Sequence, residues 1–335
     1  MRERLTWLQM ILGVVVFIVA EIVIGIPLGV AMVVDPHSPS ALGWGLLAGM
    51  TVGAAVAAAG FWLVVRFVGG RPATELARTG ALREFGAGLA IGAVLISAVM
   101  GVLALLGVYR VHGIGWTPGI ISGLAIGIGP AFIEEIFFRG LLLRLLDRWL
   151  GSWIALTVSA LLFGLIHLSN PYATVFGSVA IALEAGILMG AAFLLTRRLW
   201  LSIGIHLAWN FMLGGFYGAD VSGTGFGDGL LKATFTGPDL LTGGGMGPEG
   251  SIVALVVCTT AGVALLVAAV RRGRMLPRVR NACAGPAEGE LRASGAGRRG
   301  AGWGLAAGRR PEAAVPVPSD RAAADRSPSH RPPSD

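Results

Sequence analysis

Long apolar runs dominate the first 270 residues, and each run ends at polar or charged residues. The hydrocarbon core of a bilayer is about 30 Å thick, so a helix needs roughly 20 mainly apolar residues to cross it. The pattern predicts an all-α fold, a polytopic membrane helical bundle with about eight transmembrane helices. The expected spans are residues 8–34, 42–65, 85–109, 118–138, 152–167, 174–195, 200–217 and 251–270.

The charged residues support a membrane protein. Of the 335 residues, 54% are hydrophobic and 13% are charged, whereas in soluble domains about a quarter of all residues are charged. The arginines gather at the ends of alternate apolar runs, which is typical of cytoplasmic loops and excludes a nucleic-acid partner as the reason for the net charge of +7. One side of the bilayer would receive Arg2, Arg4, Arg66, Arg71, Arg78, Arg83, Arg144, Arg148, Arg197, Arg198, Arg271, Arg272 and Arg274. The other would receive little more than Arg110 and Lys232, so we expect both termini in the cytoplasm.

The chain divides by composition into two parts. Residues 1–276 form the expected membrane-embedded domain, and residues 277–335 are a basic tail rich in Pro, Ala, Gly and Arg that we expect to be disordered and cytoplasmic. Residues 218–250 have no helical or strand period and are expected to form a long outer loop. Cys258 and Cys283 provide no disulfide framework and no paired metal-binding spacing.

An acidic pair interrupts the fourth apolar run. Glu134 and Glu135 are about 100° apart on a helix and cannot point the same way. Arg139 follows Glu135 by four residues, a spacing that brings a carboxylate and a guanidinium together on one helix face. Charge inside a membrane usually marks a functional site. We therefore expect Glu135 to pair with Arg139 and Glu134 to face a cavity, although a buried cluster that only joins helices is the structural alternative.

A histidine near the end of the fifth span is the second candidate. Phe163 and His167 lie in this span, and the preceding turn falls near Leu150 and Gly151. Glu134 precedes that turn by about sixteen residues and His167 follows it by about the same number. If the fourth helix continues through residues 141–149, the two side chains become level in an antiparallel hairpin. A lone histidine at a span end is otherwise more often an interfacial residue.

The seventh span carries a second polar pair. His206 and Asn210 are four residues apart and therefore share one helix face. Polar groups in hydrocarbon require partners, so an interhelical hydrogen-bonding role competes with catalysis. Together with Glu134 and His167, they form a set that can polarise water and stabilise an oxyanion.

Two further acids lie inside spans. Glu184, in the sixth span, could brace His206, pair with Arg139 or line the cavity, and we assign it a supporting role. Glu21, in the first span, has no neighbouring motif and is interpreted as a buried, hydrogen-bonded carboxyl group.

The order and spacing of the three motifs resemble one known family. Glu134-Glu135-x-x-x-Arg139, then Phe163-x-x-x-His167, then His206-x-x-x-Asn210 is similar to the CPBP family, the CAAX-protease and bacteriocin-processing membrane proteases, also called the Abi family. The resemblance covers about residues 70–217. It implies a helical membrane core with a recessed site, in which Glu134 is catalytic, His167 helps to activate water, and His206 with Asn210 stabilises the oxyanion.

The resemblance leaves two mechanisms open. An older interpretation of the family makes the Glu and His residues zinc ligands, which here would be Glu134, His167 and His206, with an open position for water. A glutamate that acts as general base without metal is equally good chemistry. Asparagine is an unusual zinc ligand but a good oxyanion donor, which favours the glutamate mechanism slightly.

We therefore expect an intramembrane endopeptidase that cleaves a membrane-associated protein or peptide and has the lipid bilayer as its other partner. The alternatives are a non-catalytic membrane immunity or scaffold protein of the same fold, and a small-solute transporter that uses the polar cavity. The high Ala, Gly and Arg content is typical of a GC-rich bacterium, which predicts a bacterial plasma membrane and argues against a prenylated substrate.

Overall fold

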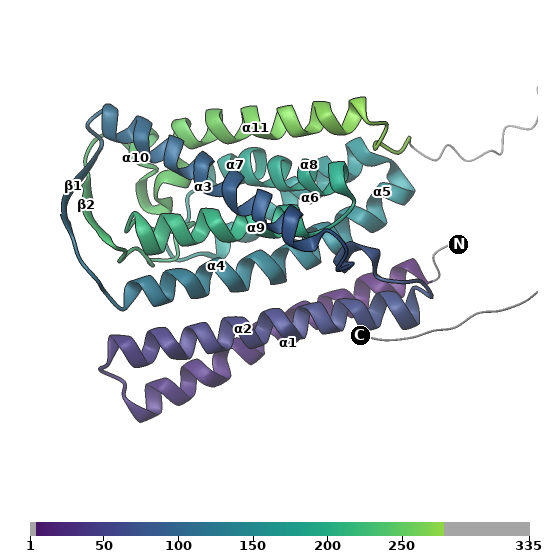
Figure 1. Ribbon diagram of the computed structural model, residues 1–335, viewed down its shortest axis with the longest axis horizontal. Helices are drawn as coiled ribbons and strands as arrows, with labels where there is room; N and C mark the ends of the chain where they lie inside the picture. Colours follow the sequence, from purple (N-terminus) through teal and green to yellow (C-terminus); the bar gives the residue numbers. More distant parts are fainter. Residues whose placement is uncertain (1–4, 278–335) are drawn as a thin grey trace, which may run out of the picture. The chain divides into compact units, whose positions relative to one another are not determined.

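The computed structural model describes residues 5–277, which belong to one compact unit, Met1–Arg280. The expected basic tail, apart from Pro277, lies outside the described residues, as does Cys283. The unit is built almost entirely of helices (Figure 1). In chain order they are α1 (Thr6–Val34), α2 (Pro39–Leu63), α3 (Ala81–Leu105), α4 (Gly119–Glu135), α5 (Arg144–Leu150), α6 (Ser152–Ile166), α7 (Val175–Ile181), α8 (Ile187–Thr196), α9 (Trp200–Asn210), α10 (Asp239–Thr242) and α11 (Ile252–Arg271).

Short non-α segments join several helices into longer rods. The π-helical segment η3 (Ile136–Leu143) links α4 to α5, η5 (Ala182–Gly186) links α7 to α8, and η6 (Phe211–Phe216) extends α9. The fourth rod therefore runs without a break to Leu150 and is longer than the expected span 118–138. π-helical turns are rare and frequently occur at functional sites. These three follow or contain a residue that the sequence singled out for the site, whereas a fourth, η1 (Val64–Val68) after α2, does not.

Within residues 5–277, seven helices are long and apolar enough to cross a membrane. They coincide with seven of the eight expected spans and confirm an all-α polytopic bundle. The remaining expected span, 200–217, is helical too, but α9 has 11 residues and η6 adds 6. This rod is shorter than the others because a loop begins at Tyr217.

Small residues allow the helix that carries His206 to lie close to α3. A β-carbon at Gly204 would lie 2.4 Å from the carbonyl oxygen of Phe85, and one at Gly88 would lie 2.4 Å from that of Leu201. Helices in membranes associate through such close backbone approach, because lipid offers no hydrophobic driving force between them. The glycines therefore set the position of α9 in the bundle.

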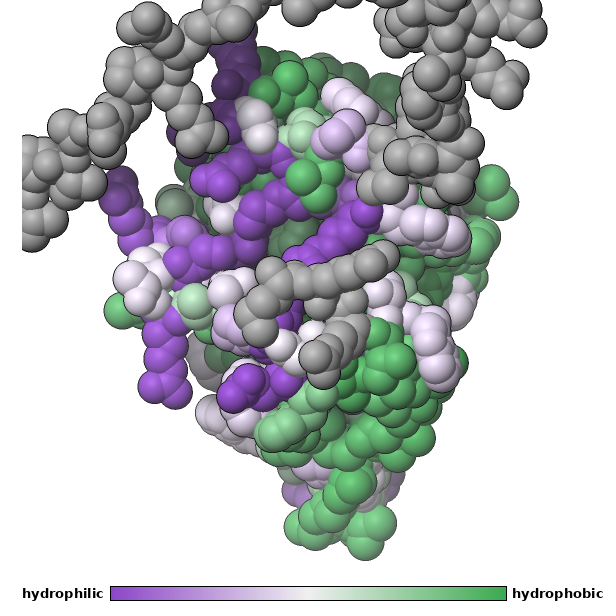
Figure 2. All heavy atoms as spheres, turned by 90° about the vertical axis from the view of Figure 1, so that its right-hand side faces the viewer, coloured by the Kyte–Doolittle hydropathy of each residue, from purple (hydrophilic) through white to green (hydrophobic). Residues whose placement is uncertain are grey.

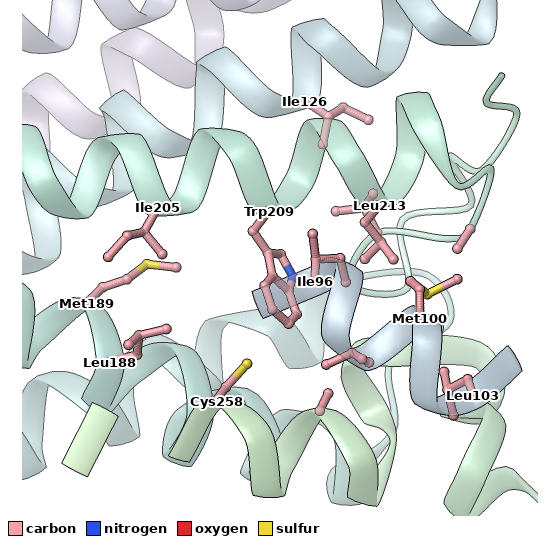
Figure 3. Close-up of a cluster of buried hydrophobic side chains, with 14 of the residues drawn as sticks. Ile96, Met100, Leu103, Ile126, Leu188, Met189, Ile205, Trp209, Leu213 and Cys258 are labelled. Carbon is pink, nitrogen blue, oxygen red and sulfur yellow. The ribbon is translucent and has the colours of Figure 1, made fainter. Parts of the chain in front are cut away.

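A large apolar core lies between α9, α3, α8 and α11. Figure 3 shows Trp209 projecting from α9 toward Cys258 on α11, between side chains of α3 and α8. Trp209 and Cys258 are both buried, and Cys258 is a free thiol. The cluster also contains Ile96, Met100, Leu103, Ile126, Leu188, Met189, Ile205 and Leu213. This packing holds one face of α9 while its other face is free to line a site.

Basic side chains gather at one end of the unit. Figure 2 faces this end and shows hydrophilic residues collected over it. Arg197, after α8, pairs with Asp147 of α5, and Arg198 pairs with Glu84 of α3. The arginines that the sequence assigned to one membrane side thus also tie helix ends together.

A small two-stranded sheet joins the expected loop 218–250 to the segment that follows α3. Strand β1 (Tyr109–Ile114) pairs antiparallel with β2 (Leu231–Phe235), with Tyr109 opposite Phe235. Both strands lie at the left of Figure 1. The prediction that residues 218–250 lack a strand was wrong, and the expected span 85–109 ends four residues early, at Leu105. The partner strands are more than a hundred residues apart, so neither strand can be recognised from its local sequence alone.

The close α3–α9 contact makes a prediction about Gly204. Gly204→Ala should lower stability by about 1–3 kcal/mol, because the added methyl group meets backbone that cannot move aside. Gly101→Ala is the matched control, since a β-carbon there has no atom within 4 Å. Thermal unfolding of the purified variants measures both. Equal melting temperatures for the two variants would contradict the close contact.

Candidate functional site

Glu135 forms the centre of a buried polar cluster. Its Oε1 accepts a hydrogen bond from Nη1 of Arg139 at 2.8 Å and lies 3.1 Å from Nδ1 of His206. Glu135 and Arg139 are completely buried, and His206 is 5% exposed. The structure thus forms the ion pair expected from the i, i+4 spacing. The three side chains join the fourth rod to α9. Loss of Glu135 or Arg139 would leave the other charge buried without compensation.

Arg139 is fixed by two further contacts. Its Nη2 donates to the carbonyl oxygen of Ala185 at 3.2 Å, in the π-helical segment η5. Its guanidinium carbon lies 4.2 Å from the ring centre of Phe163. A cation over an aromatic face gains electrostatic energy from the ring quadrupole. Phe163, the first residue of the second motif, therefore packs on Arg139, and its ring is also 4.8 Å from that of His167.

Glu134 points away from this cluster. It makes no hydrogen bond with any described residue, and its Oε2 is buried. It lines a cavity of about 310 Å³, which we call the main cavity. Liquid water occupies about 30 Å³ per molecule, so the space accepts several waters or part of an extended chain. The polar residues lining it are Glu21, Glu134, His167, Ser169, Asn170, His206, Asn210, Ser222 and Thr224.

His167 reaches the main cavity from the end of α6. Its Nδ1 is 2.7 Å from the carbonyl oxygen of Phe163. A carbonyl oxygen can only accept, so Nδ1 carries the proton and Nε2 of the neutral ring is an acceptor. The chain turns at Gly151 between the rod ending at Leu150 and α6. The expected hairpin is therefore present, and both Glu134 and His167 line one cavity.

Asn210 is oriented by a proline on the facing helix. Pro130 lies inside α4 and has no N–H, so it cannot bond the carbonyl group of Ile126. Nδ2 of Asn210 donates to that carbonyl oxygen at 3.2 Å. The contact assigns the amide nitrogen to this side and leaves a second N–H on the same nitrogen for other partners. The proline thus creates the acceptor that orients Asn210.

The residues considered as zinc ligands do not fit a zinc site in this arrangement. Within residues 5–277, no three His, Cys, Asp or Glu side chains are placed to hold a metal ion together. Nδ1 of His206 is directed at Glu135 and Nδ1 of His167 at a backbone carbonyl group. Glu134, His167 and His206 share the cavity wall but do not form a metal-binding group.

Glu184 lies behind His206. It is 2% exposed, has no hydrogen bond with a described residue, and lines a second cavity of about 20 Å³ with His206. It does not pair with Arg139, which bonds the carbonyl groups of Ala185 and Gly186 instead. Of the three roles considered for Glu184, lining a cavity agrees with the structure, and pairing with Arg139 was wrong.

Glu21 also differs from its expected state. It was interpreted as a buried, hydrogen-bonded carboxyl group, but its side chain is exposed and forms no hydrogen bond with a described residue. It lines the main cavity from α1, opposite Glu134 on α4. The sequence could not show this, because Glu21 and Glu134 are separated by more than a hundred residues.

Glu249 is a buried acid that the sequence reasoning missed. It lies in the 3₁₀ turn η8 (Pro248–Gly250) before α11. Its Oε1 accepts from Nε1 of Trp209 at 2.6 Å, and its Oε2 accepts from the Oγ of Ser222 at 2.7 Å and from the backbone N–H of Ser222. Trp209 precedes Asn210, and Ser222 lines both cavities. Glu249 thus ties the loop after η6 to the helix that carries the site.

The contacts of Ser222 extend this tie to the His167 side. The carbonyl oxygen of Ser222 accepts from Nδ2 of Asn170 at 2.7 Å, and the backbone N–H of Tyr172 donates to Gly223. Asn170 follows His167 by three residues. The loop expected to be without structure therefore covers the cavity and joins both histidine-bearing segments.

Comparison with known protein families supports the resemblance seen in the motifs. Residues 114–212 match the family model described as type II CAAX prenyl endopeptidase, Rce1-like. This range contains all three motifs and confirms the similarity to the CPBP family. No curated protein and no solved structure matches the chain. Glu21 and Glu249 both lie outside the matched range.

The Glu249 cluster makes a prediction about stability and pH. Burial raises the pKa of Glu249, whereas its hydrogen bonds with Ser222 and Trp209 lower it without cancelling the effect. The folded protein therefore holds this proton more tightly than the unfolded chain. The resulting stability is fully present below about pH 4.5 and is lost as the pH rises through the higher folded-state pKa.

Glu249→Gln loses one acceptor, so a buried N–H or O–H loses its partner, at a cost of about 1–3 kcal/mol. The deficit relative to wild type should be largest near pH 5 and shrink toward pH 8, because only the wild type titrates. Thermal unfolding of wild type and variant between pH 5 and pH 8 measures this difference in stability. Asp228→Asn, which removes an exposed ion pair with Lys232 in the same loop, should cost at most about 1 kcal/mol. An equal loss in both variants would contradict the role of Glu249.

Proposed function

We propose that this protein is an intramembrane endopeptidase that hydrolyses a peptide bond in a membrane-associated protein or peptide. The observation that carries the proposal is Glu134, a carboxyl group without a hydrogen-bond partner among residues 5–277, on the wall of a cavity that two histidines and an asparagine share. The match of residues 114–212 to a CAAX prenyl endopeptidase family supports the same class of reaction.

Glu134 acts as the general base. The neighbouring Glu135 accepts from Arg139 and His206 through Oε1, is completely buried and does not line the main cavity. Glu134 lacks such contacts, so it can accept a proton from a water molecule that lies between it and the substrate. A base must lie within hydrogen-bond reach of the proton that it removes, and the cavity offers room for that water beside the carboxyl group.

His167 orients the same water. Its Nδ1–H is held by the carbonyl oxygen of Phe163, so Nε2 is the acceptor of the neutral ring. Two acceptors, Nε2 of His167 and the carboxylate of Glu134, can then bind the two hydrogens of one water. This arrangement directs a lone pair of the water oxygen toward the substrate carbonyl carbon.

Asn210 is the first donor to the oxyanion. Its Nδ2 has one hydrogen on Ile126 and a second available to the cavity. Nδ1–H of His206 is directed at Glu135, so donation from its Nε2 requires the doubly protonated ring. Donors held in place before the reaction are worth about 2.7–4 kcal/mol each in the transition state.

The proposed reaction balances with one water. The water oxygen bonds to the carbonyl carbon while its proton moves to Glu134, and the carbonyl oxygen becomes the oxyanion. The C–N bond then breaks as Glu134 returns the proton to the departing amine. The products are a carboxylic acid and an amine, and Glu134 regains its initial state.

The location of the substrate follows from the helices. We infer that the arginine-rich end faces the cytoplasm of a bacterial plasma membrane, because cytoplasmic loops carry an excess of basic residues. The main cavity opens among α1, α4, α6 and α9, so the cleaved bond belongs to a segment within or beside the bilayer.

Loss of the base provides the direct test. Glu134→Gln should abolish cleavage in a folded protein, with a rate reduction of about 10²-fold or more for a positioned acid–base group. The measurement is mass spectrometry of new peptide N-termini in membranes from cells that express either form. Glu84→Gln, at an acid paired with Arg198 at the basic end, is the matched control and should retain cleavage. The same new termini with Glu134→Gln would exclude Glu134 as the base. Absence of any wild-type-specific terminus would favour the scaffold or immunity protein.

The question of a metal has its own test. Because the candidate ligands do not converge, we expect cleavage of an identified substrate to continue after treatment with a chelator such as 1,10-phenanthroline. Loss of cleavage followed by recovery on addition of Zn²⁺ would show that the side chains rearrange around a metal during catalysis.

A further inference from the structure

Glu21 lies at the same level as Glu134 on the facing helix. One turn before Glu21, the ring of Phe17 lies 4.9 Å from that of Phe137, which follows Glu134 on the same rod. One turn after Glu21, Ile24 meets Ile133 beside Gly53. These two contacts run in opposite chain directions and bracket the acids. Glu21 and Glu134 therefore face one cavity from opposite walls, as their shared lining indicates.

The main cavity has two carboxyl groups and neither lysine nor arginine among the described residues that line it. Its titratable residues are Glu21, Glu134, His167 and His206. The nearest guanidinium, that of Arg139, is completely buried against Glu135, Phe163 and backbone carbonyl groups. Neither glutamate has a hydrogen-bond partner among the described residues. A cation that enters the cavity lies beside both carboxyl groups and favours their ionised form, so the cation and the acids stabilise each other.

Apolar side chains line the rest of the cavity. Phe17, Ile126, Pro130, Ile166 and Val221 form this part of the wall. The side chains of Lys and Arg have apolar stems and charged ends, so they can lie along apolar surface while their charge reaches a polar group. The lining thus matches both parts of such a side chain.

We propose that Glu21 is a specificity-determining residue that, together with Glu134, selects a membrane segment with a Lys or Arg side chain next to the cleaved bond. The inference deepens the proposed function, since it takes the main cavity to receive the substrate. The same charge disfavours a segment with an acidic side chain or a free carboxyl terminus at that position. Glu21 binds the basic side chain, and Glu134 retains the water.

The test measures binding rather than cleavage, so that it can fail independently of the proposed reaction. The probes are three synthetic single-span peptides with acetylated and amidated ends that differ only in one central residue, which is lysine, norleucine or glutamate. Their equilibrium binding is measured with the purified full-length protein in lipid nanodiscs. Norleucine keeps the length of lysine without its charge.

Wild type should bind the lysine peptide roughly tenfold more tightly than the norleucine peptide, and the glutamate peptide most weakly. Glu21→Gln should remove most of the lysine advantage, and Glu21→Lys should make the glutamate peptide the tightest. Ile22→Gln, at a lipid-exposed position one residue away, is the matched control and should keep the wild-type order. Thermal unfolding of each variant in nanodiscs establishes that it is folded.

The outcomes separate the two proposals. An unchanged order of affinities in Glu21→Gln, or an equal affinity of wild type for all three peptides, would overturn the role of Glu21 and leave the protease proposal as it stands. The predicted order in a protein that produces no new N-termini would retain a cation-selective cavity and reject proteolysis.

Discussion

The site depends on a guanidinium held where water does not reach. Arg139 is completely buried, and its charge is compensated by Glu135, backbone carbonyl groups of η5 and the face of Phe163. These contacts come from three parts of the chain, so one buried charge fixes the first two motifs and η5 relative to one another, and the third motif is joined to them through the contact of Glu135 with His206. A buried pair adds little stability compared with apolar packing, but it is very sensitive to the loss of either partner. Its effect here is one of geometry, because Glu135 also fixes the ring of His206.

The local part of the site could be predicted from the sequence. The four-residue spacing of Glu135 and Arg139 determines that they share a helix face, and the adjacent position of Glu134 then directs it elsewhere. The hairpin that brings His167 to the cavity follows from counting residues on either side of a turn. The family match over residues 114–212 agrees with this part of the reasoning, whereas the chemical roles of these residues are still predictions.

The remaining parts of the site depend on contacts between distant segments. Glu249 meets Trp209 and Ser222, and Glu21 meets the cavity, only after helices far apart in the chain have packed together. Strands β1 and β2 are likewise defined by each other, since a short strand has little pattern of its own. A glycine-rich loop in particular gives no period from which to infer structure. The one available signal was a single acid, Glu249, immediately before a long apolar helix.

The length of the rod formed by α9 and η6 has a consequence for the bilayer. At 1.5 Å per residue, Trp200–Phe216 rises about 26 Å, a few ångströms less than the hydrocarbon thickness. A segment shorter than the hydrocarbon layer is accommodated by local thinning of the membrane or by polar groups that reach inward. The loop that covers the cavity begins where this rod ends. Because α9 is buried among other helices, protein rather than lipid occupies the depth beyond its end, and the loop there contributes the polar side chains of Ser222 and Thr224 to the cavity that Asn210 lines.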